Sequence, residues 1–154
     1  MQSAVSLLYE TEARLRALPF FADFSEVALW ETLRLGKWFD LPKGKVMMRE
    51  GQPGDSFCLI VDGAVAVSRK ERVLSTIAQG SSIGEMTYLQ PSNRMRTATV
   101  VASTDVVAFK IRNEALRQAS LELQGEFDKV FIKLLVNRLI ATNQQLADWD
   151  LVLE

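Results

Sequence analysis

The segment 37–111 constrains the fold more than any other part of the chain. Its apolar runs are short and rich in Val, Ile and Phe, and Gly, Pro, Asp and Asn break them at intervals of about 8–12 residues. This spacing is typical of a β-barrel or β-sandwich. We therefore expect strands at 37–41, 46–49, 56–61, 64–68, 73–77, 97–102 and 106–111.

Turn signals separate these runs. Asp62-Gly63 stands between FCLIV and AVAVS and predicts a two-residue β-hairpin. Pro42-Lys43-Gly44 and Gln52-Pro53-Gly54-Asp55 predict two further turns.

Residues 1–36 predict two helices. The apolar residues of the first fall near one helical stripe, and Pro19 ends the segment; the stripe is Val5, Leu8, Leu15 and Leu18. The second helix begins at a cap, Asp23 or Ser25, and ends at Gly36. Its expected apolar face is Val27, Trp30 and Leu33.

Residues 113–150 predict further helices, the last of them long. Its apolar residues alternate at spacings of three and four, as in a coiled-coil seam with one polar member: Ile132, Leu135, Leu139, Thr142, Leu146, Trp149 and Leu153. A flanking stripe comprises Phe127, Phe131, Leu134 and Ile140. We expect one stripe to pack on the barrel and the seam to form a homodimer. The alternative is that both stripes are buried within one chain.

The composition excludes several classes of site. The chain has no histidine and one cysteine, Cys58, so zinc sites built on His, Ser-His-Asp hydrolases, Cys-His proteases and His-ligated haem are excluded. Cys58, on an expected strand, predicts an inert buried thiol. The formal net charge of −1 argues against non-specific nucleic-acid binding. The sequence shows no signal peptide and no apolar run of about 20 residues, so we expect a cytoplasmic protein.

Residues 81–102 carry the candidate chemistry. Gly84 lets the backbone approach a ligand, and the following EMTYL is compatible with one helical turn whose free N–H groups attract an anion. Arg96 matches two phosphate oxygens, whereas an ionised Glu85 needs a hydroxyl or a cation. A ligand with one phosphate and one ribose hydroxyl satisfies both. The alternative is that Glu85 and Arg96 pair with each other or lie in solvent.

Two ordered motifs resemble the cyclic nucleotide-binding domain family. The first is Gly54-Asp55, Phe57 and Gly63-Ala64-Val65. The second is similar to the family's phosphate-binding cassette, here residues 82–100, with Gly84-Glu85 and Arg96-Thr97-Ala98-Thr99-Val100. The resemblance covers about residues 18–150. It implies one α+β domain over 1–154: an antiparallel β-roll or jelly-roll barrel flanked by N-terminal helices and a long C-terminal helix.

The resemblance also implies roles for single residues. Glu85 would bind the ribose 2′-hydroxyl, and Arg96 would pair with the cyclic phosphate. Thr142-Asn143 match a step on the dimerisation helix of cyclic AMP receptor proteins that contacts the base, although Thr142 could instead set the register of the seam. The implied ligand-binding residues are Ile83, Gly84, Glu85, Met86, Thr87, Arg96, Thr97, Ala98, Thr142 and Asn143.

The sequence departs from the family at three places. Ile83 replaces the common Phe, Met86-Thr87-Tyr88 stands where Leu-Ala or Leu-Gly-Leu usually follows Gly-Glu, and the loop Gln90–Met95 is one or two residues longer. A slip in that loop would make Arg94 the phosphate ligand; we favour Arg96 because Thr97-Ala98-Thr99-Val100 follows it directly. Trp30, Trp38 and the phenylalanines are expected in the core, and Trp149 at the seam or over the pocket.

The sequence predicts a sensor of cyclic nucleotides, cAMP in preference to cGMP, that is not an enzyme and needs no cofactor or metal. Nothing after residue 154 supplies a DNA-reading helix-turn-helix, so an unidentified effector protein or fused output domain is expected as partner, without DNA or membrane binding. The alternative is a dimerisation scaffold on the same fold that no longer binds nucleotide. A cupin-type metal enzyme is disfavoured by the absence of histidine.

Overall fold

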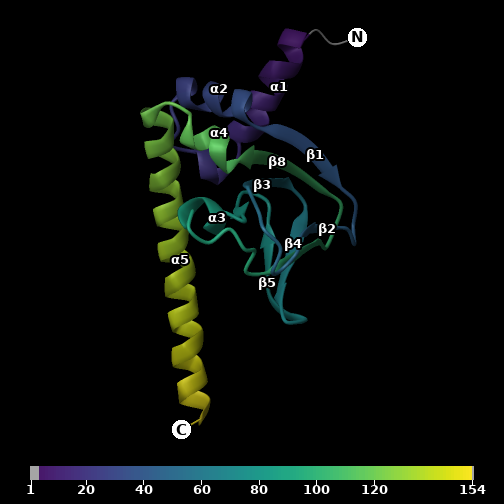
Figure 1. Cartoon of the computed structure of the whole chain (residues 1–154), viewed down its shortest axis with the longest axis vertical. Coiled ribbons are helices and arrows are strands. Elements are labelled where there is room, and N and C mark those ends of the chain that lie inside the picture. The colour runs from purple at the N-terminus through teal and green to yellow at the C-terminus, as the bar shows by residue number, and fades with distance from the viewer. Residues whose placement is uncertain (1–3, 154) are drawn as a thin grey trace.

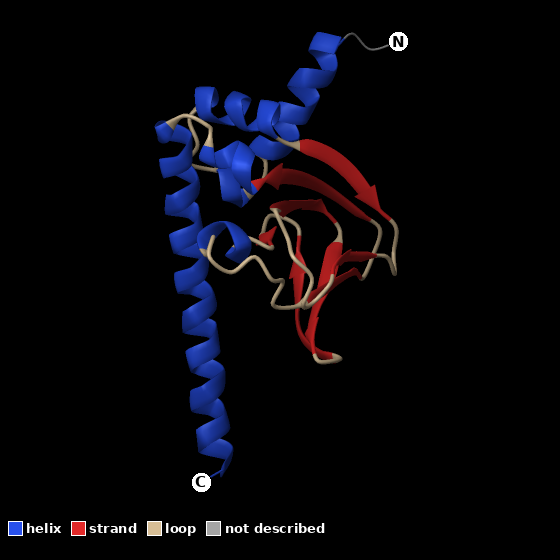
Figure 2. Ribbon diagram, viewed as in Figure 1, coloured by secondary structure: helices blue, strands red, loops and turns tan. Residues whose placement is uncertain are grey.

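A computed structural model describes the backbone of residues 4–153 and the side chains of residues 10–148. Val5 and Leu8 of the first stripe, and Trp149 and Leu153 of the seam, have side chains outside the described residues. Five α-helices and eight strands occur in the described part (Figures 1 and 2). The helices are α1 (Ala4–Arg16), α2 (Glu26–Leu35), α3 (Met86–Leu89), α4 (Asn113–Arg117) and α5 (Leu121–Leu153), with a 3₁₀ turn at Pro19–Phe21.

The strands form two antiparallel sheets of four. They are β1 (Lys37–Leu41), β2 (Val46–Met48), β3 (Ser56–Asp62), β4 (Ala64–Arg69), β5 (Arg72–Ala78), β6 (Ser82–Ile83), β7 (Thr99–Ala102) and β8 (Val106–Arg112). The first sheet has the order β1-β8-β3-β6 and the second β2-β7-β4-β5. The α+β roll with flanking helices is therefore confirmed, and each expected strand is found within two residues of its predicted ends. Only the two-residue β6 was not predicted.

The hairpin predicted at Asp62-Gly63 is wrong. The strands on either side of this turn, β3 and β4, belong to different sheets. Gly63 has φ +90° and lies against the backbone of Asp105, so it carries the chain from one sheet to the other. The hairpin joins β4 to β5 instead. Its two-residue turn, Lys70-Glu71, has positive φ at both positions, 51° and 65°, the conformation that favours Gly or Asn.

The second helix begins as expected but buries a different face. The Ser25 hydroxyl accepts a hydrogen bond from the Ala28 N–H at 3.1 Å. Of the predicted apolar face, Val27 is wrong because it is 73% exposed, whereas Trp30 and Leu33 are half-buried and Leu33 packs against the core. The buried residues are Ala28, Leu29 and Thr32. Thr32 is polar and was not part of the predicted apolar face. It can be buried because its hydroxyl donates to the Ala28 carbonyl at 2.8 Å.

Gly36 follows α2 but is not a left-handed cap. Its φ is −108°, which any residue adopts. A β-carbon at this position would overlap the ring of Phe109. The glycine is therefore needed for close packing of the chain on β8 and not for its conformational freedom.

Two cores hold the domain together. One lies between the helices and the first sheet and contains a continuous group of contacting aromatic rings, with Phe20, Phe21, Phe24, Phe57, Phe127 and Phe131. The other lies between the two sheets and includes Cys58, Ile60 and Ala108. The phenylalanines and the buried Cys58 are where the sequence predicted them. Trp30 and Trp38 are only half-buried.

The long helix α5 has a buried half and an exposed half. Leu123, Phe127 and Phe131 are fully buried against the first core. Beyond Phe131 the helix continues alongside the β-roll, and its C-terminal end extends further than the β4–β5 hairpin (Figure 1). Its exposed apolar side chains there are Ile132, Val136, Leu139, Ile140 and Leu146, each 48–62% exposed. Among the described seam residues of one chain, Ile132, Leu139, Thr142 and Leu146 are therefore exposed and Leu135 is half-buried, and Ile140 of the flanking stripe is exposed as well.

Candidate functional site

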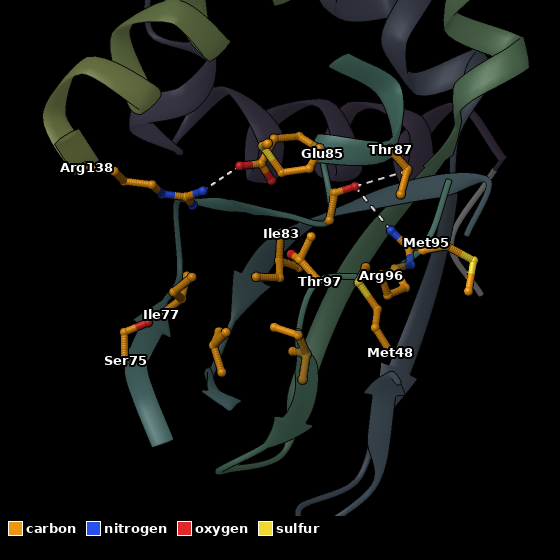
Figure 3. A pocket seen from close by; sticks show the side chains of 15 residues that line it. Met48, Ser75, Ile77, Ile83, Glu85, Thr87, Met95, Arg96, Thr97 and Arg138 are labelled. Atoms are coloured by element: carbon orange, nitrogen blue, oxygen red, sulfur yellow. Dashed lines mark hydrogen bonds and ion pairs between the residues drawn. The ribbon is translucent and has the colours of Figure 1, made fainter. Parts of the chain in front are cut away.

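One pocket of about 210 Å³ lies between the cassette, the second sheet and α5 (Figure 3). Eight of the ten predicted site residues line it: Ile83, Gly84, Glu85, Met86, Thr87, Arg96, Thr97 and Ala98. Val67 and Ser75 line it from β4 and β5. We call it the cassette pocket.

The floor of the pocket is built by the turn from β6 into α3. Gly84 has φ +83°, a conformation that other residues rarely adopt. Glu85 then starts α3, and its carbonyl accepts the N–H groups of Tyr88 and Leu89. The first N–H groups of a helix have no partner within it, so those of Met86 and Thr87 lie at the end that attracts anions.

Arg96 enters the pocket from the loop before β7. Its guanidinium donates to the Gly84 carbonyl at 3.1 Å and to the Ser56 carbonyl at 2.7 Å. A β-carbon on Gly54 would overlap this side chain. The loop itself is fixed, because the backbone of Arg96 exchanges hydrogen bonds with Gln52 and Gly51. The glycine of the first motif thus makes room for the arginine of the second.

The charge on Arg96 is not neutralised by a carboxylate. Among residues 10–148, no ion pair within 4.0 Å involves it. Burial lowers the pKa of Arg96 from its usual value, and the nearby Asp55 carboxylate acts in the opposite direction. A guanidinium nevertheless stays protonated at neutral pH. Arg96 is therefore a half-buried cation bonded to neutral carbonyl groups, which favours binding of an anion.

Glu85 has a partner that the sequence did not reveal. Its side chain is almost fully buried and forms an ion pair and hydrogen bond with Nη1 of Arg138 on α5 (Figure 3). Arg138 Nη2 also donates to the Ser82 carbonyl at 2.9 Å and to the Ser81 hydroxyl at 3.3 Å. Glu85 therefore pairs neither with Arg96 nor with solvent. The contact ties α5 to the cassette.

Thr87 is buried and fully engaged. Its hydroxyl donates to the Gly84 carbonyl at 3.3 Å and accepts a hydrogen bond from the side chain of Asn113 at 3.0 Å. Asn113 is the first residue of α4, so this contact joins the short cassette helix to the end of β8. Both threonines line the pocket, but Thr87 is buried and supports its floor, whereas Thr97 is exposed.

Three other candidates do not line the cassette pocket. Thr142 and Asn143 are exposed on α5, and the Thr142 hydroxyl donates to the Arg138 carbonyl one turn earlier at 2.9 Å. Arg94 is exposed, and its carbonyl accepts the Gly54 N–H at 2.8 Å. Of the two arginines in this loop, only Arg96 lines the pocket.

Sequence reasoning missed seven lining residues: Met48, Val67, Ser75, Ile77, Met95, Val100 and Arg138. Most come from distant strands, and no local pattern marks them. Arg138 could have been found, since it lies four residues before Thr142 and residues four apart share one face of a helix.

This β-roll presents an unneutralised arginine and a buried carboxylate in one pocket, the arrangement of a domain that can bind a small ligand with an anionic group. Comparison with known proteins makes the class specific. Residues 38–122, more than half of the chain, match the cyclic nucleotide-binding domain family, and the chain belongs to that family.

A curated relative and two solved structures illustrate the similarity. The chain is 31% identical over 114 residues to a CRP-like cAMP-activated global transcriptional regulator from Mycobacterium tuberculosis; the match covers 71% of this chain and 50% of the relative. The chain therefore spans about half the length of that relative. The structure of PKAR CBD2 bound to Sp-2Cl-cAMPS has a TM-score of 0.74 at 20% identity, covering 90% of each chain. The sensor domain of the transcriptional regulator DNR from Pseudomonas aeruginosa has a TM-score of 0.68 at 20% identity, covering 92% of this chain and 94% of the other.

The part of the chain that the structure describes contains neither a cluster of metal-binding side chains nor a membrane-spanning helix. No three His, Cys, Asp or Glu side chains there are grouped so that they could hold a metal ion. None of the described helices combines the length and the apolar character that crossing a membrane requires.

Proposed function

We propose that this chain binds a cyclic nucleotide, cAMP in preference to cGMP, in the cassette pocket and acts as a regulatory domain, not as an enzyme. The observation that carries the proposal is that Glu85 and Arg96 line one pocket without pairing with each other. The cyclic phosphate would bind Arg96 and the first N–H groups of α3. The ribose 2′-hydroxyl would donate to Glu85.

The preference for cAMP rests on the relative that is described as cAMP-activated and is 31% identical to this chain. Thr97 follows Arg96 directly and is exposed to the pocket. Its hydroxyl can both donate and accept, so it does not distinguish the two purines.

Calorimetric titration of the whole chain with cAMP and cGMP tests the proposal. Two charge-assisted hydrogen bonds contribute about 1.5–3 kcal/mol each. Arg96→Ala should therefore weaken cAMP binding by roughly 100-fold or more. Arg94→Ala, in the same loop but exposed, is the matched control and should change affinity little. Absence of binding by the unmodified chain would contradict the proposal, and equal losses in the two variants would contradict the site assignment.

We propose that the signal leaves through α5. Arg138 is the only described residue of α5 that lines the cassette pocket, and it contacts the carboxylate that the ribose would need. A ligand that changes this contact favours a different position of the exposed half of α5, because a ligand shifts the population of any state with which it interacts differently.

The homodimer is part of the same proposal. Ile132, Leu139 and Leu146 are 58–62% exposed on α5 and have the spacing of a coiled-coil seam; Leu135, Thr142 and Trp149 complete the predicted seam. Light scattering should give twice the mass of the chain. Leu139→Asp should halve that mass, whereas Gln144→Glu, which adds a charge away from the seam, should not. An unchanged mass for Leu139→Asp would contradict the seam.

The second candidate is a dimerisation scaffold that binds no nucleotide. The exposed seam supports it, and the two tests separate the candidates. A dimer that gives no heat with either nucleotide would favour the scaffold.

A further inference from the structure

A second cavity lies between the two sheets. It has a volume of about 370 Å³ and is bounded by the edge strands β1 and β2, on the side of the β-roll away from α5 (Figure 1). Its apolar wall comprises Trp38, Phe39, Leu41, Val46 and Met47. Met48 and Arg96 line both this cavity and the cassette pocket, so they form the wall between the two.

Two exposed lysines line this end of the barrel. Along β8, Val106 and Ala108 face the core between the sheets, and Lys110 is the next residue on that face because side chains alternate along a strand. On β1, Phe39 and Leu41 pack against the same core, and Lys37 continues their face toward the cavity. On each of the two strands, the residue that would continue the core-facing apolar row is therefore a lysine.

These two lysines are direct cross-strand neighbours. Lys37 is the register partner of Lys110 in the antiparallel pair of β1 and β8. Like charges in directly opposite positions on neighbouring strands are destabilising, and an anion bound between them would offset this repulsion. Neither lysine has a carboxylate within 4.0 Å in the described part of the chain.

Arg96 adds a third positive charge to the lining, and the lining itself contains no carboxylate. Asp55 lines the polar mouth next to the cavity, together with Arg49 and the same Lys110. Asp40 lies on β1, but it belongs to the face opposite to that of Lys37. The cavity thus combines an apolar wall with an excess of positive charge at its edge.

We propose that this cavity binds an amphipathic carboxylate, with the acid group between Lys37 and Lys110 and the apolar chain along Phe39 and Leu41. The size limits the ligand. A group the size of a water molecule takes about 30 Å³, so about 370 Å³ accommodates roughly a dozen such groups. An unbranched acid of about eight to twelve carbons fits this limit. The two lysines do not line the cassette pocket, so the proposal does not depend on nucleotide binding, although Arg96 and Met48 are shared by the two cavities.

Calorimetry with sodium decanoate, in the absence of nucleotide, tests the site. The unmodified chain should bind decanoate, and 1-decanol, which has the same chain without the charge, should bind at least about 10-fold more weakly. The double variant Lys37→Met and Lys110→Met keeps the apolar stems and removes both charges, so it should weaken decanoate binding at least about 10-fold. Lys110→Arg should retain binding.

The matched control is Lys133→Met on the exposed face of α5, which should leave decanoate affinity unchanged. Circular dichroism should confirm that each variant is folded; both lysines are exposed, so folding should persist. No binding of decanoate by the unmodified chain would overturn the proposal. Equal binding of decanoate and decanol, or an unchanged affinity in the double lysine variant, would overturn it as well.

Discussion

Removal of Arg138 is the sharpest test of how α5 is joined to the cassette. Arg138→Met keeps the apolar stem of the side chain but removes every donor. The variant loses the ion pair with Glu85 and the hydrogen bonds to Ser82 and Ser81. It leaves the Glu85 carboxylate buried without its cation.

The expected loss lies between two limits. Breaking a fully buried ion pair costs about 3–5 kcal/mol, whereas exposed pairs contribute about 0–1 kcal/mol because water and salt screen them. The side chain of Glu85 is 2% exposed, as in a buried pair, whereas that of Arg138 is 36% exposed, as in a surface pair. The expected loss therefore lies between the two limits. We expect a loss of about 2 kcal/mol in the free energy of unfolding, which lowers Tm by roughly 4–8 °C in a domain of this size.

Urea unfolding of four proteins measures the contact itself. These are the unmodified chain, Arg138→Met, Glu85→Gln and the double variant, and the coupling energy of the cycle should be about 1–2 kcal/mol. Lys133→Met, also on α5, should change stability by less than about 0.5 kcal/mol. A coupling energy within about 0.3 kcal/mol of zero would refute the reasoning, because independent sites add to that accuracy.

Three further predictions concern stability and reactivity. Phe131→Ala removes a fully buried ring from the aromatic group; we expect a loss of about 3–5 kcal/mol in urea unfolding, and a loss below about 1 kcal/mol would contradict the packing. Hydrogen bonds from the Ser120 side chain and backbone lower the pKa of Glu31 below 4.5. Its contribution to stability is therefore present above pH 4.5 and is lost as the pH falls through the lower folded-state pKa. Unfolding measured against pH should show Glu31→Gln less stable than the unmodified chain at pH 7 and equally stable once the carboxyl is protonated in both states; a constant difference would contradict this assignment. Burial raises the pKa of Cys58 to about 12, so iodoacetamide at pH 8 should alkylate Cys58 only in urea; alkylation of the native chain at the same rate would show that the thiol is accessible.

The order of strands could be predicted from the sequence, but the pairing could not. Short runs separated by turn residues gave every strand except β6, because burial and turn chemistry are local signals. The hairpin predicted at Asp62-Gly63 does not form, because β3 and β4 lie in different sheets. A Gly with positive φ permits a sharp turn in either case, and whether the next strand pairs with the last or joins the other sheet depends on contacts far along the chain. Thr32 and Val27 show the same limit: burial of a polar residue depends on a local hydrogen bond that an apolar pattern does not register.

Most of the cassette pocket could be predicted because it is nearly continuous in sequence. Residues 83–87 and 96–98 come together through one helical turn and one loop. The helix face of Arg138 could be inferred from Thr142, but its pairing with Glu85 could not, because 53 residues separate the two and the packing of α5 on the domain brings them together. The longer loop at 90–95 has a structural role at its end. The Arg94 carbonyl accepts the Gly54 N–H, and the Arg96 N–H donates to the Gln52 carbonyl, so the backbone is fixed next to the arginine that lines the pocket.

Arg138 contacts the cassette from a part of α5 that does not pack in the aromatic core. Phe127 and Phe131 fix the first part of the helix against aromatic rings of the domain. Seven residues after Phe131, nearly two turns, Arg138 makes the contacts to the cassette, and the apolar side chains around it are exposed. Under the proposed function, a change at Glu85 would therefore move the exposed half of α5 at the expense of a few polar contacts, without breaking the aromatic packing of the buried half. A carboxylate has about four acceptor positions, so a ligand hydroxyl can bind Glu85 either beside Arg138 or in its place. The two outcomes differ only in whether α5 keeps its contacts to Ser81 and Ser82.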